Sequence, residues 1–330
     1  MKVLFIGGTG IISSACSQLA IDKGIDLYLL NRGKTAYRSV PEGAHIITSD
    51  INDVDRIRKE ITGLYFDSVV DWIVYTKEQL ERDIRIFQEN TGQYIFISSA
   101  SVYQKPIANL PITESTMIDN PFWLYSQNKI ACEERLVQAY HQAKFPMTIV
   151  RPSHTYDRTL LPFDGGYTVI DRMRKGKKVI VHGDGTSLWT LTHHKDFAVG
   201  FVGLLGNPHA IGDVYHITSD ESLTWNQIYE IMAHVAGVEP RPVHVPSELI
   251  AAFDPEWGAG LLGDKAHSVI FDNTKIKRLV PEFKAVIPFA RGAEEIMTWY
   301  NADPARQMVD PEVDRMVDRI IEAYEKAWTK

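Results

Sequence analysis

The first half of the chain alternates between two hydrophobic patterns. Short, nearly continuous apolar runs predict buried strands at Lys2–Ile6, Ile25–Leu30, Ala44–Thr48, Asp67–Val74, Gln93–Ser98 and Met147–Arg151. Longer segments with helical spacing separate these runs, at Ile11–Lys23, Asp53–Ile61, Lys77–Asn90 and Trp123–Lys144. Strands that are apolar on both sides and joined by helices are typical of a parallel sheet covered on both faces. The pattern predicts a doubly wound α/β domain.

This regularity weakens after about Asp157. Glycine-rich turns and prolines at positions 240, 242, 246, 255, 281 and 288 divide the second half into short pieces. We therefore expect the doubly wound domain over residues 1–157 and a smaller mixed α/β lobe over residues 158–330. Apolar positions from Val313 to Trp328 mark one face of a final helix, which docks either on its own core or on a second copy of the chain.

Composition narrows the class of protein. With 330 residues, of which 45% are hydrophobic and 23% charged, the chain can bury a large core. The 35 basic and 42 acidic side chains leave a formal net charge of −7, which argues against a surface that binds nucleic acid. Only two cysteines occur, and no apolar run approaches the ~20 residues of a membrane helix. We expect a reduced, soluble, cytoplasmic protein.

The first strand leads directly into the glycine-rich segment Gly7-Gly8-Thr9-Gly10-Ile11-Ile12-Ser13. Glycines permit a tight turn and let the backbone approach a pyrophosphate at the positive end of the following helix. The order strand, turn, helix is the context that this motif requires. The segment predicts a dinucleotide site, although Ser13 stands where the third glycine is usual.

The loop after the second predicted strand indicates which dinucleotide binds. A carboxylate there would accept hydrogen bonds from the adenosine ribose of NAD, whereas a cation would neutralise the 2′-phosphate of NADP. This chain has Asn31-Arg32-Gly33-Lys34, with two cations and no acid, which favours NADP with NAD as the alternative; the two cations are otherwise ordinary surface charges. Asp50 follows the third strand and is placed to accept from the adenine amino group.

Tyr125 and Lys129 begin a predicted helix and are four residues apart, so both side chains lie on one helical face. A free tyrosine has a pKa near ~10 and is a poor base at neutral pH. A neighbouring ammonium and a positive nicotinamide ring both favour the phenolate, so we expect the pKa of Tyr125 to be lowered. Hydroxyl groups gather upstream in Ser98-Ser99-Ala100-Ser101-Val102-Tyr103, at the end of a predicted strand.

The adjacent pair His193-His194 with Asp196 raises the question of a metal site. If the segment is a strand, neighbouring side chains point to opposite faces and the imidazoles do not converge on one ion. Catalytic zinc requires three convergent ligands. We therefore expect no metal.

These motifs occur in a familiar order. GGTGII, Asp50, SSASVY, Tyr125/Lys129 and Arg151-Pro152-Ser153-His154 together resemble the extended short-chain dehydrogenase/reductases of the sugar-nucleotide epimerase/dehydratase family. The resemblance covers most of the chain and implies a Rossmann-type fold, an NAD(P) cofactor, and a return of the chain to the first domain near residues 189–218. It also implies a homodimer as a possible assembly.

The resemblance assigns roles to residues. Ser99, Tyr125 and Lys129 would be catalytic: Ser99 and Tyr125 would bond the substrate oxygen, Tyr125 would be the acid and base, and Lys129 would hold the nicotinamide ribose. The cofactor would contact Gly7, Thr9, Gly10, Ile11, Ile12, Asn31, Arg32, Lys34, Asp50, Ile51, Ser98, Tyr125, Lys129, Pro152 and Ser153. The substrate would contact Tyr75, Ser101, Tyr103, His154 and Trp189.

Departures from the family pattern narrow the reaction. Ala100 and Ser101 occupy the positions where family dehydratases place an Asp-Glu pair, which disfavours a 4,6-dehydratase. Trp189 stands where epimerases commonly carry an arginine for the substrate diphosphate. We expect an epimerase or carbonyl reductase for a sugar or sugar nucleotide, without nucleic-acid or membrane partners. The alternative is a non-catalytic NADP sensor or RNA-binding protein, because the hydroxyl cluster and the Asn-Arg-Gly loop also resemble chloroplast stem-loop-binding proteins.

Overall fold

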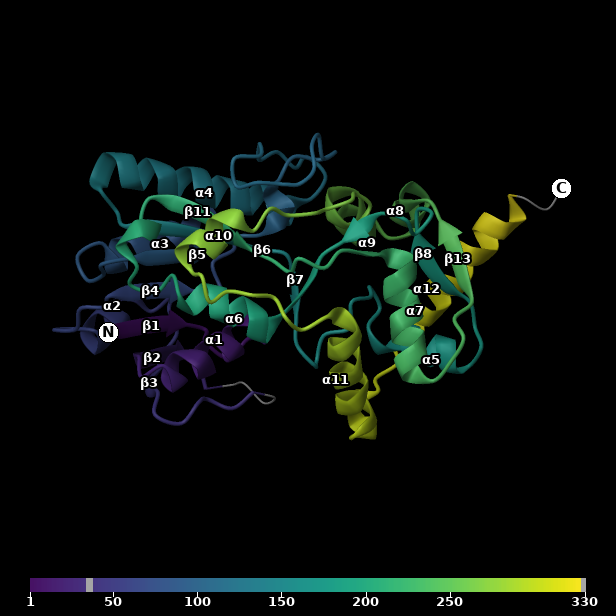
Figure 1. Ribbon diagram of the computed structural model, residues 1–330, viewed down its shortest axis with the longest axis horizontal. Coiled ribbons are helices and arrows are strands. Elements are labelled where there is room, and N and C mark those ends of the chain that lie inside the picture. Colours follow the sequence, from purple (N-terminus) through teal and green to yellow (C-terminus); the bar gives the residue numbers. More distant parts are fainter. Residues whose placement is uncertain (34–37, 328–330) are drawn as a thin grey trace.

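A sheet of seven parallel strands forms one half of the molecule (Figure 1). The structure is a computed structural model that describes residues 1–33 and 38–327. The strands follow the order β11-β6-β5-β4-β1-β2-β3. Their bounds are β1 Lys2–Ile6, β2 Asp26–Asn31, β3 His45–Thr48, β4 Ser68–Asp71, β5 Tyr94–Ile97, β6 Met147–Pro152 and β11 Asp213–Ile217. The order reverses between β1 and β4, and in open parallel sheets ligands bind at such a point, outside the carboxyl ends of the strands.

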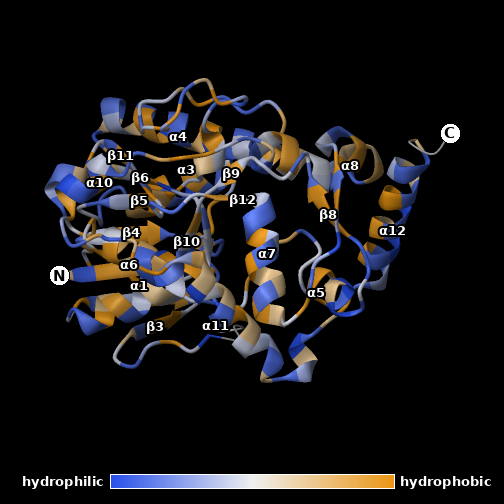
Figure 2. Cartoon of the chain, turned by 45° about the vertical axis from the view of Figure 1, so that its right-hand side comes forward, coloured by the Kyte–Doolittle hydropathy of each residue, from blue (hydrophilic) through white to orange (hydrophobic). Residues whose placement is uncertain are grey.

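Helices cover both faces of this sheet because its strands are apolar on both sides. Val3 and Phe5 of β1 pack with α1 (Ile11–Asp22), α6 (His194–Val202) and α10 (Thr274–Leu279). Leu4 and Ile6 pack on the opposite face with α2 (Val54–Glu60), α3 (Lys77–Phe87) and α4 (Leu124–Ala143). Figure 2 shows the result, with hydrophobic strands between helices whose outer surfaces are largely hydrophilic.

The second half of the chain builds a smaller lobe beside the sheet (Figure 1). Its helices are α5 Tyr167–Arg174, α7 Trp225–Ala236, α8 Ser247–Phe253, α9 Pro255–Gly260, α11 Phe289–Asn301 and α12 Pro311–Lys326. Short two-stranded sheets pair β7 (His154–Tyr156) with β10 (Leu191–His193), β9 (Leu188–Trp189) with β12 (Leu223–Thr224), and β8 (Val179–His182) with β13 (Pro242–Val245). The predicted doubly wound, Rossmann-type fold with a mixed α/β lobe is confirmed.

The final helix docks on its own lobe. Val317, Ile320 and Ile321 of α12 share an apolar cluster with Ile180 and Ile250. The buried guanidinium of Arg172 donates to Asp314 and Asp318 on the same helix. The structure therefore confirms the first interpretation of this helix, docking on its own core. Trp328 lies outside the described residues.

The chain comes back to the sheet after leaving it at β6. Strand β11 pairs in parallel with β6 through residues 213–217, and Ile276 of α10 contributes to the core on the α1 side. The predicted division of the chain at residue 157 stays a prediction.

Over residues 1–33 and 38–327, every helix is too short or too polar to cross a membrane.

Candidate functional site

A tight turn between β1 and α1 forms the predicted pyrophosphate cradle. Gly7 has a φ of +96°, a conformation that side chains other than glycine rarely adopt. A Cβ on Gly8 would lie 2.5 Å from Leu29 Cδ2 and 2.9 Å from Ser17 Oγ. Gly10 is the N-cap of α1, so the amide groups of the first turn face the crevice. The glycines are therefore required by the geometry of this turn.

Ser13, at the position where the third glycine is usual, has a specific local role. Its buried hydroxyl accepts a hydrogen bond of 2.7 Å from the amide of Gly10. The serine thus holds one of the amides that open α1. Ile11 and Ile12 follow in the first turn of the same helix, and the carbonyl of Ile11 lies 3.3 Å from His194 Nδ1.

A groove of about 410 Å³ leads from this cradle along the carboxyl ends of β1, β2 and β3. Most of the predicted adenosine-side residues line it: Gly7, Thr9, Gly10, Asn31, Arg32, Asp50 and Ile51. Asn52, Gln79 and Arg82 line it as well, which the sequence did not single out. Because the groove joins a phosphate cradle to a polar end, these residues fit the adenosine half of a dinucleotide.

Of the two cations predicted to select the dinucleotide, Arg32 lies within the described residues and Lys34 does not. Arg32 is exposed at the polar end of the groove, beside Asn31, whose side-chain oxygen accepts from the amide of Gly33 at 2.8 Å. Lys34 lies outside the described residues.

Asp50 accepts from both the backbone amide and the side-chain amide of Asn52, each at 2.9 Å, so one carboxylate oxygen is fixed by its own loop.

The Ser/Tyr/Lys residues come together where β5 and α4 meet. Tyr125 lies in the first turn of α4, and Ser99 follows β5 closely. Ser99 lies close enough to hydrogen-bond with Tyr125, an interaction that lowers the pKa of the phenol. Ser99 Oγ is also 2.9 Å from Ser101 Oγ, which accepts from Ser126 Oγ at 2.7 Å. A chain of hydroxyl groups therefore begins at the phenol.

The prediction of a lowered pKa for Tyr125 is wrong for the chain as it stands. The pKa of the Tyr125 phenol is raised to about 12, mainly by burial and also by the nearby Tyr75 and Asp264, while the hydrogen bond with Ser99 lowers it. Lys129 is not among the groups that shift the pKa of this phenol. The phenol is protonated at neutral pH, which is the form that donates a proton.

Lys129 is held by the last residue of β5 and by the loop that follows β4. Its ammonium donates to the carbonyl of Val74 at 2.6 Å and to that of Ile97 at 2.7 Å. Its Nζ lies 4.8 Å from the centre of the Tyr75 ring. Burial lowers the pKa of Lys129 to about 8. An ammonium has three N–H groups, so one remains for a ligand in the crevice.

Two hydroxyl residues of the predicted set face the interior instead. Ser98 Oγ donates to Glu133 at 2.5 Å, and Glu133 also forms a buried ion pair with Arg151. Tyr103, predicted to contact substrate, is fully buried, and its hydroxyl lies 3.1 Å from His216 Nδ1. The prediction for Tyr103 is therefore wrong, because its ring is part of the core. The hydroxyl of Ser98 is already committed to Glu133.

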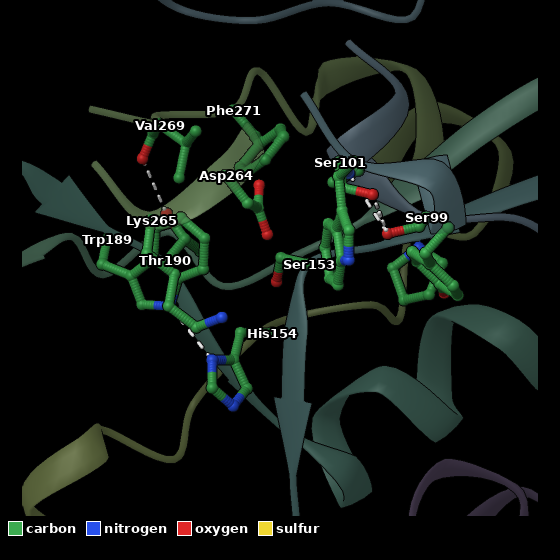
Figure 3. Close-up of a pocket in the computed structure, with 14 residues that line it drawn as sticks. Ser99, Ser101, Ser153, His154, Trp189, Thr190, Asp264, Lys265, Val269 and Phe271 are labelled. Carbon is green, nitrogen blue, oxygen red and sulfur yellow. Dashed lines mark hydrogen bonds between the residues drawn. The ribbon is translucent and has the colours of Figure 1, made fainter. Parts of the chain in front are cut away.

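A cavity of about 240 Å³ lies between the hydroxyl chain and the lobe (Figure 3). Ser99, Ser101 and Tyr125 line one side, with Pro152 and Ser153 at the end of β6. The predicted substrate residues His154 and Trp189 line the other side, where the Trp189 indole donates to His154 Nδ1 at 3.1 Å. Tyr75 is 48% exposed and stands outside the cavity, with its ring centre 6.4 Å from that of Tyr125.

Sequence reasoning missed two charged residues of this cavity. Asp264 and Lys265 close η3, a π-helical turn at Leu261–Lys265, and both line the cavity. They lie well over 100 positions after Tyr125 in the irregular half of the chain, where no periodicity or motif marks them. Only the folded chain brings them to the phenol.

The His193-His194 pair lies at a junction rather than within a strand. His193 ends β10 and caps α6, accepting from the amide of Lys195 at 3.3 Å, while His194 begins that helix. His193 Nε2 lies 3.2 Å from Glu295. Both rings have structural partners, and no group of three metal-binding side chains occurs within residues 1–33 and 38–327.

Comparison with known proteins agrees with this arrangement. The model of the NAD dependent epimerase/dehydratase family matches residues 84–218, which contain Ser99, Tyr125 and Lys129. A 2′-dehydrokanamycin reductase of Streptomyces kanamyceticus is 24% identical over 288 residues, covering 86% of this chain and 80% of the relative. A chloroplast stem-loop binding protein of 41 kDa from Arabidopsis thaliana is 26% identical over 258 residues, covering 74% and 65%.

A solved structure shares the fold over nearly the whole chain. The UDP-glucose 4-epimerase of Thermus thermophilus, in complex with NAD, superposes with a TM-score of 0.71 at 17% identity, covering 91% of this chain and 99% of that one. The resemblance found in the sequence is confirmed: the protein has the fold of the extended short-chain dehydrogenase/reductases. The match of residues 84–218 to the epimerase/dehydratase family model agrees with this resemblance.

Proposed function

We propose that the protein is an NAD(P)-dependent oxidoreductase that transfers hydride to or from a sugar or sugar nucleotide, as an epimerase or a carbonyl reductase. One observation carries the proposal: Ser99 and Tyr125 face a cavity that opens beside Pro152 and Ser153, and the Lys129 ammonium lies 5.7 Å from the centre of the Tyr125 ring. A substrate hydroxyl or carbonyl in this cavity meets a proton donor and a second hydroxyl at once.

Each residue of the site has its own role in the proposed reaction. The glycine turn and the groove to Asp50 would hold the dinucleotide, whose nicotinamide ring supplies or accepts the hydride. Tyr125 gives its proton to the substrate oxygen in reduction and takes it back in oxidation. Ser99 bonds the same oxygen and fixes its position. Lys129 would use its remaining N–H on the nicotinamide ribose.

The finer choices are proposals that rest on particular residues. Arg32, at the polar end of the groove, supports NADP, with NAD as the alternative. Ala100 and Ser101 lie in the 3-10 turn η1 (Ala100–Val102) after β5 and supply no acid for eliminating water, so 4,6-dehydration is disfavoured. The relative named as a reductase supports net reduction, and the neighbour named as an epimerase supports epimerisation. A cytoplasmic location and a homodimer remain predictions.

Transfer of deuterium tests the proposed chemistry directly. The purified protein is incubated with NADPH or NADH carrying deuterium at C4 and with ketosugars, and the products are examined by mass spectrometry. We expect one deuterium in the product and a faster reaction with NADPH. Identification of any dinucleotide that co-purifies separates the two reactions, because a tightly retained oxidised cofactor indicates internal recycling of hydride and a freely exchanging one indicates a reductase.

A second candidate function follows from one relative. The match to the Arabidopsis stem-loop binding protein favours RNA binding on the same fold. The net charge of −7 opposes it, since RNA binding relies on positive surface charge. A filter-binding titration with structured RNA at several salt concentrations decides between the two, because RNA binding through phosphates weakens steeply as salt rises.

A further inference from the structure

The lobe contributes an acidic group to the cavity that the proposed chemistry does not use. Asp264 lies on η3, and its carboxylate points into the space between Trp189 on one side and Ser99 and Ser101 on the other (Figure 3). Its side chain is 17% exposed. A carboxylate that is held in a cavity and still reached by solvent is available to a ligand.

A buried lysine anchors this carboxylate from behind. Lys105 Nζ lies 3.4 Å from Asp264 Oδ1, and the Lys105 side chain is fully buried. Within the described residues this ammonium makes no hydrogen bond, so Asp264 is its counter-charge without being saturated by it. A carboxylate has about four acceptor positions, which leaves room for hydrogen bonds from a ligand.

The position of Asp264 relative to the hydroxyl chain is also fixed. The buried side-chain amide of Asn120 donates to the carbonyl of Ser101 at 2.7 Å and to that of Gly263 at 2.6 Å. A Cβ on Gly263 would lie 2.7 Å from Trp123 Cβ, so this turn packs directly against the residue that precedes α4. The lobe therefore presents Asp264 to Tyr125 through rigid contacts.

The rest of the cavity is lined by one cation, a neutral imidazole and aromatic rings. Lys265 is the one cationic side chain among the described residues that line it, and it stands against the single negative charge of Asp264. Burial lowers the pKa of His154 to about 3, so that ring is neutral. Trp123, Trp189 and Phe271 supply apolar walls.

The size of the cavity limits what enters it. Its volume of about 240 Å³ is below the ~300–1,000 Å³ of pockets that enclose drug-sized ligands. The volume suits a single ring. Trp189 lies in its wall, where the family pattern would place an arginine for a diphosphate. A diphosphate beside the cavity would meet the carboxylate of Asp264, and among the described lining residues only Lys265 would offer it a positive charge.

We propose that Asp264 is a substrate-recognition residue that accepts hydrogen bonds from the hydroxyl groups of an uncharged polyol of one-ring size. The ammonium of Lys265 donates to another hydroxyl, and Tyr125 faces the oxygen on the reacting carbon. This inference rests on the proposed function and makes it narrower: the site takes an unphosphorylated sugar ring in preference to a sugar nucleotide.

Direct binding measurements test the proposal. Protein saturated with NADP is titrated with methyl glucopyranoside, methyl galactopyranoside, methyl mannopyranoside, myo-inositol and UDP-glucose, and saturation-transfer NMR gives the affinities. We expect at least one neutral polyol to bind more tightly than UDP-glucose. Asp264→Asn should weaken that binding about ten-fold or more, and the exposed control Glu134→Gln should leave it unchanged.

A second variant guards against loss of folding. Asp264→Asn leaves Lys105 buried without a counter-charge, so the double variant Asp264→Asn/Lys105→Met is measured beside it and should lose the same affinity. Tighter binding of UDP-glucose than of every neutral polyol, absence of neutral binding, or unchanged affinity in both variants would overturn the proposal. Binding that depends on Asp264 without deuterium transfer from the cofactor would instead contradict the proposed function alone.

Discussion

The ammonium of Lys129 lies 5.7 Å from the centre of the Tyr125 ring, yet burial rather than this charge sets the acidity of the phenol. Lys129 itself donates to the carbonyls of Val74 and Ile97. The arrangement holds a protonated tyrosine next to a lysine whose own pKa is lowered. The pair is therefore suited to begin with donation of a proton to a substrate oxygen.

The lowered pKa of Lys129 predicts how stability depends on pH. In the unfolded chain this lysine keeps its proton up to its ordinary pKa of 10.5, whereas in the folded chain it loses it near 8. Between these values the unfolded state binds more protons, so the free energy of unfolding rises with pH. Urea unfolding should show the difference between wild type and Lys129→Met increasing from about pH 8 to about pH 10, by at most about 1.4 kcal/mol per unit. A flat or falling difference contradicts the assignment.

Arg32 should determine the preference for the phosphorylated dinucleotide. A charge-assisted hydrogen bond to the 2′-phosphate contributes about 1.5–3 kcal/mol, so Arg32→Ala should lower the ratio of NADPH to NADH affinity about ten-fold or more. Calorimetric titration of both dinucleotides measures this ratio. Arg315→Ala, on the exposed side of α12, is the matched control and should leave the ratio unchanged. An equal loss of affinity for both dinucleotides would show that Arg32 does not contact the 2′-phosphate.

Glu133 should stabilise the fold beneath the site. It bonds Ser98 and Arg151 in a buried network, and its removal leaves the Arg151 guanidinium without its counter-charge. Loss of one partner from a buried ion pair typically costs about 3–5 kcal/mol, so Glu133→Ala should lower the free energy of unfolding by that amount. The exposed neighbour Glu134→Ala should change it by less than about 0.5 kcal/mol. Similar losses in both variants would show that the network is not stabilising.

Much of the sheet half could be predicted because its strands carry a local signal. Residues Lys2–Ile6 are apolar enough to be buried on both faces, and the predicted strand matches β1 residue for residue. The cradle was predictable for the same reason, since Gly7 and Gly10 lie at fixed offsets from that strand. Tyr125 and Lys129 were found through their spacing on one helix, which is a local property of the sequence.

The wall of the cavity opposite Tyr125 could not be predicted. Asp264 and Lys265 lie in a five-residue π-helical turn, too short for a hydrophobic period to show. Their placement depends on Asn120 and Lys105, which are distant in sequence. The burial of Tyr103 was missed for a related reason, because its partner His216 belongs to β11, which enters the sheet long after β5.

We propose that the Tyr125 phenol moves the proton during hydride transfer. Its most direct test is the rate of deuterium transfer in a single turnover by Tyr125→Phe, with Tyr140→Phe on the same helix as control. Since general acid catalysis contributes about 10²–10⁴-fold, we expect a loss of that size in Tyr125→Phe, with dinucleotide affinity retained and the control unchanged. A rate in Tyr125→Phe equal to that of the wild type would contradict it.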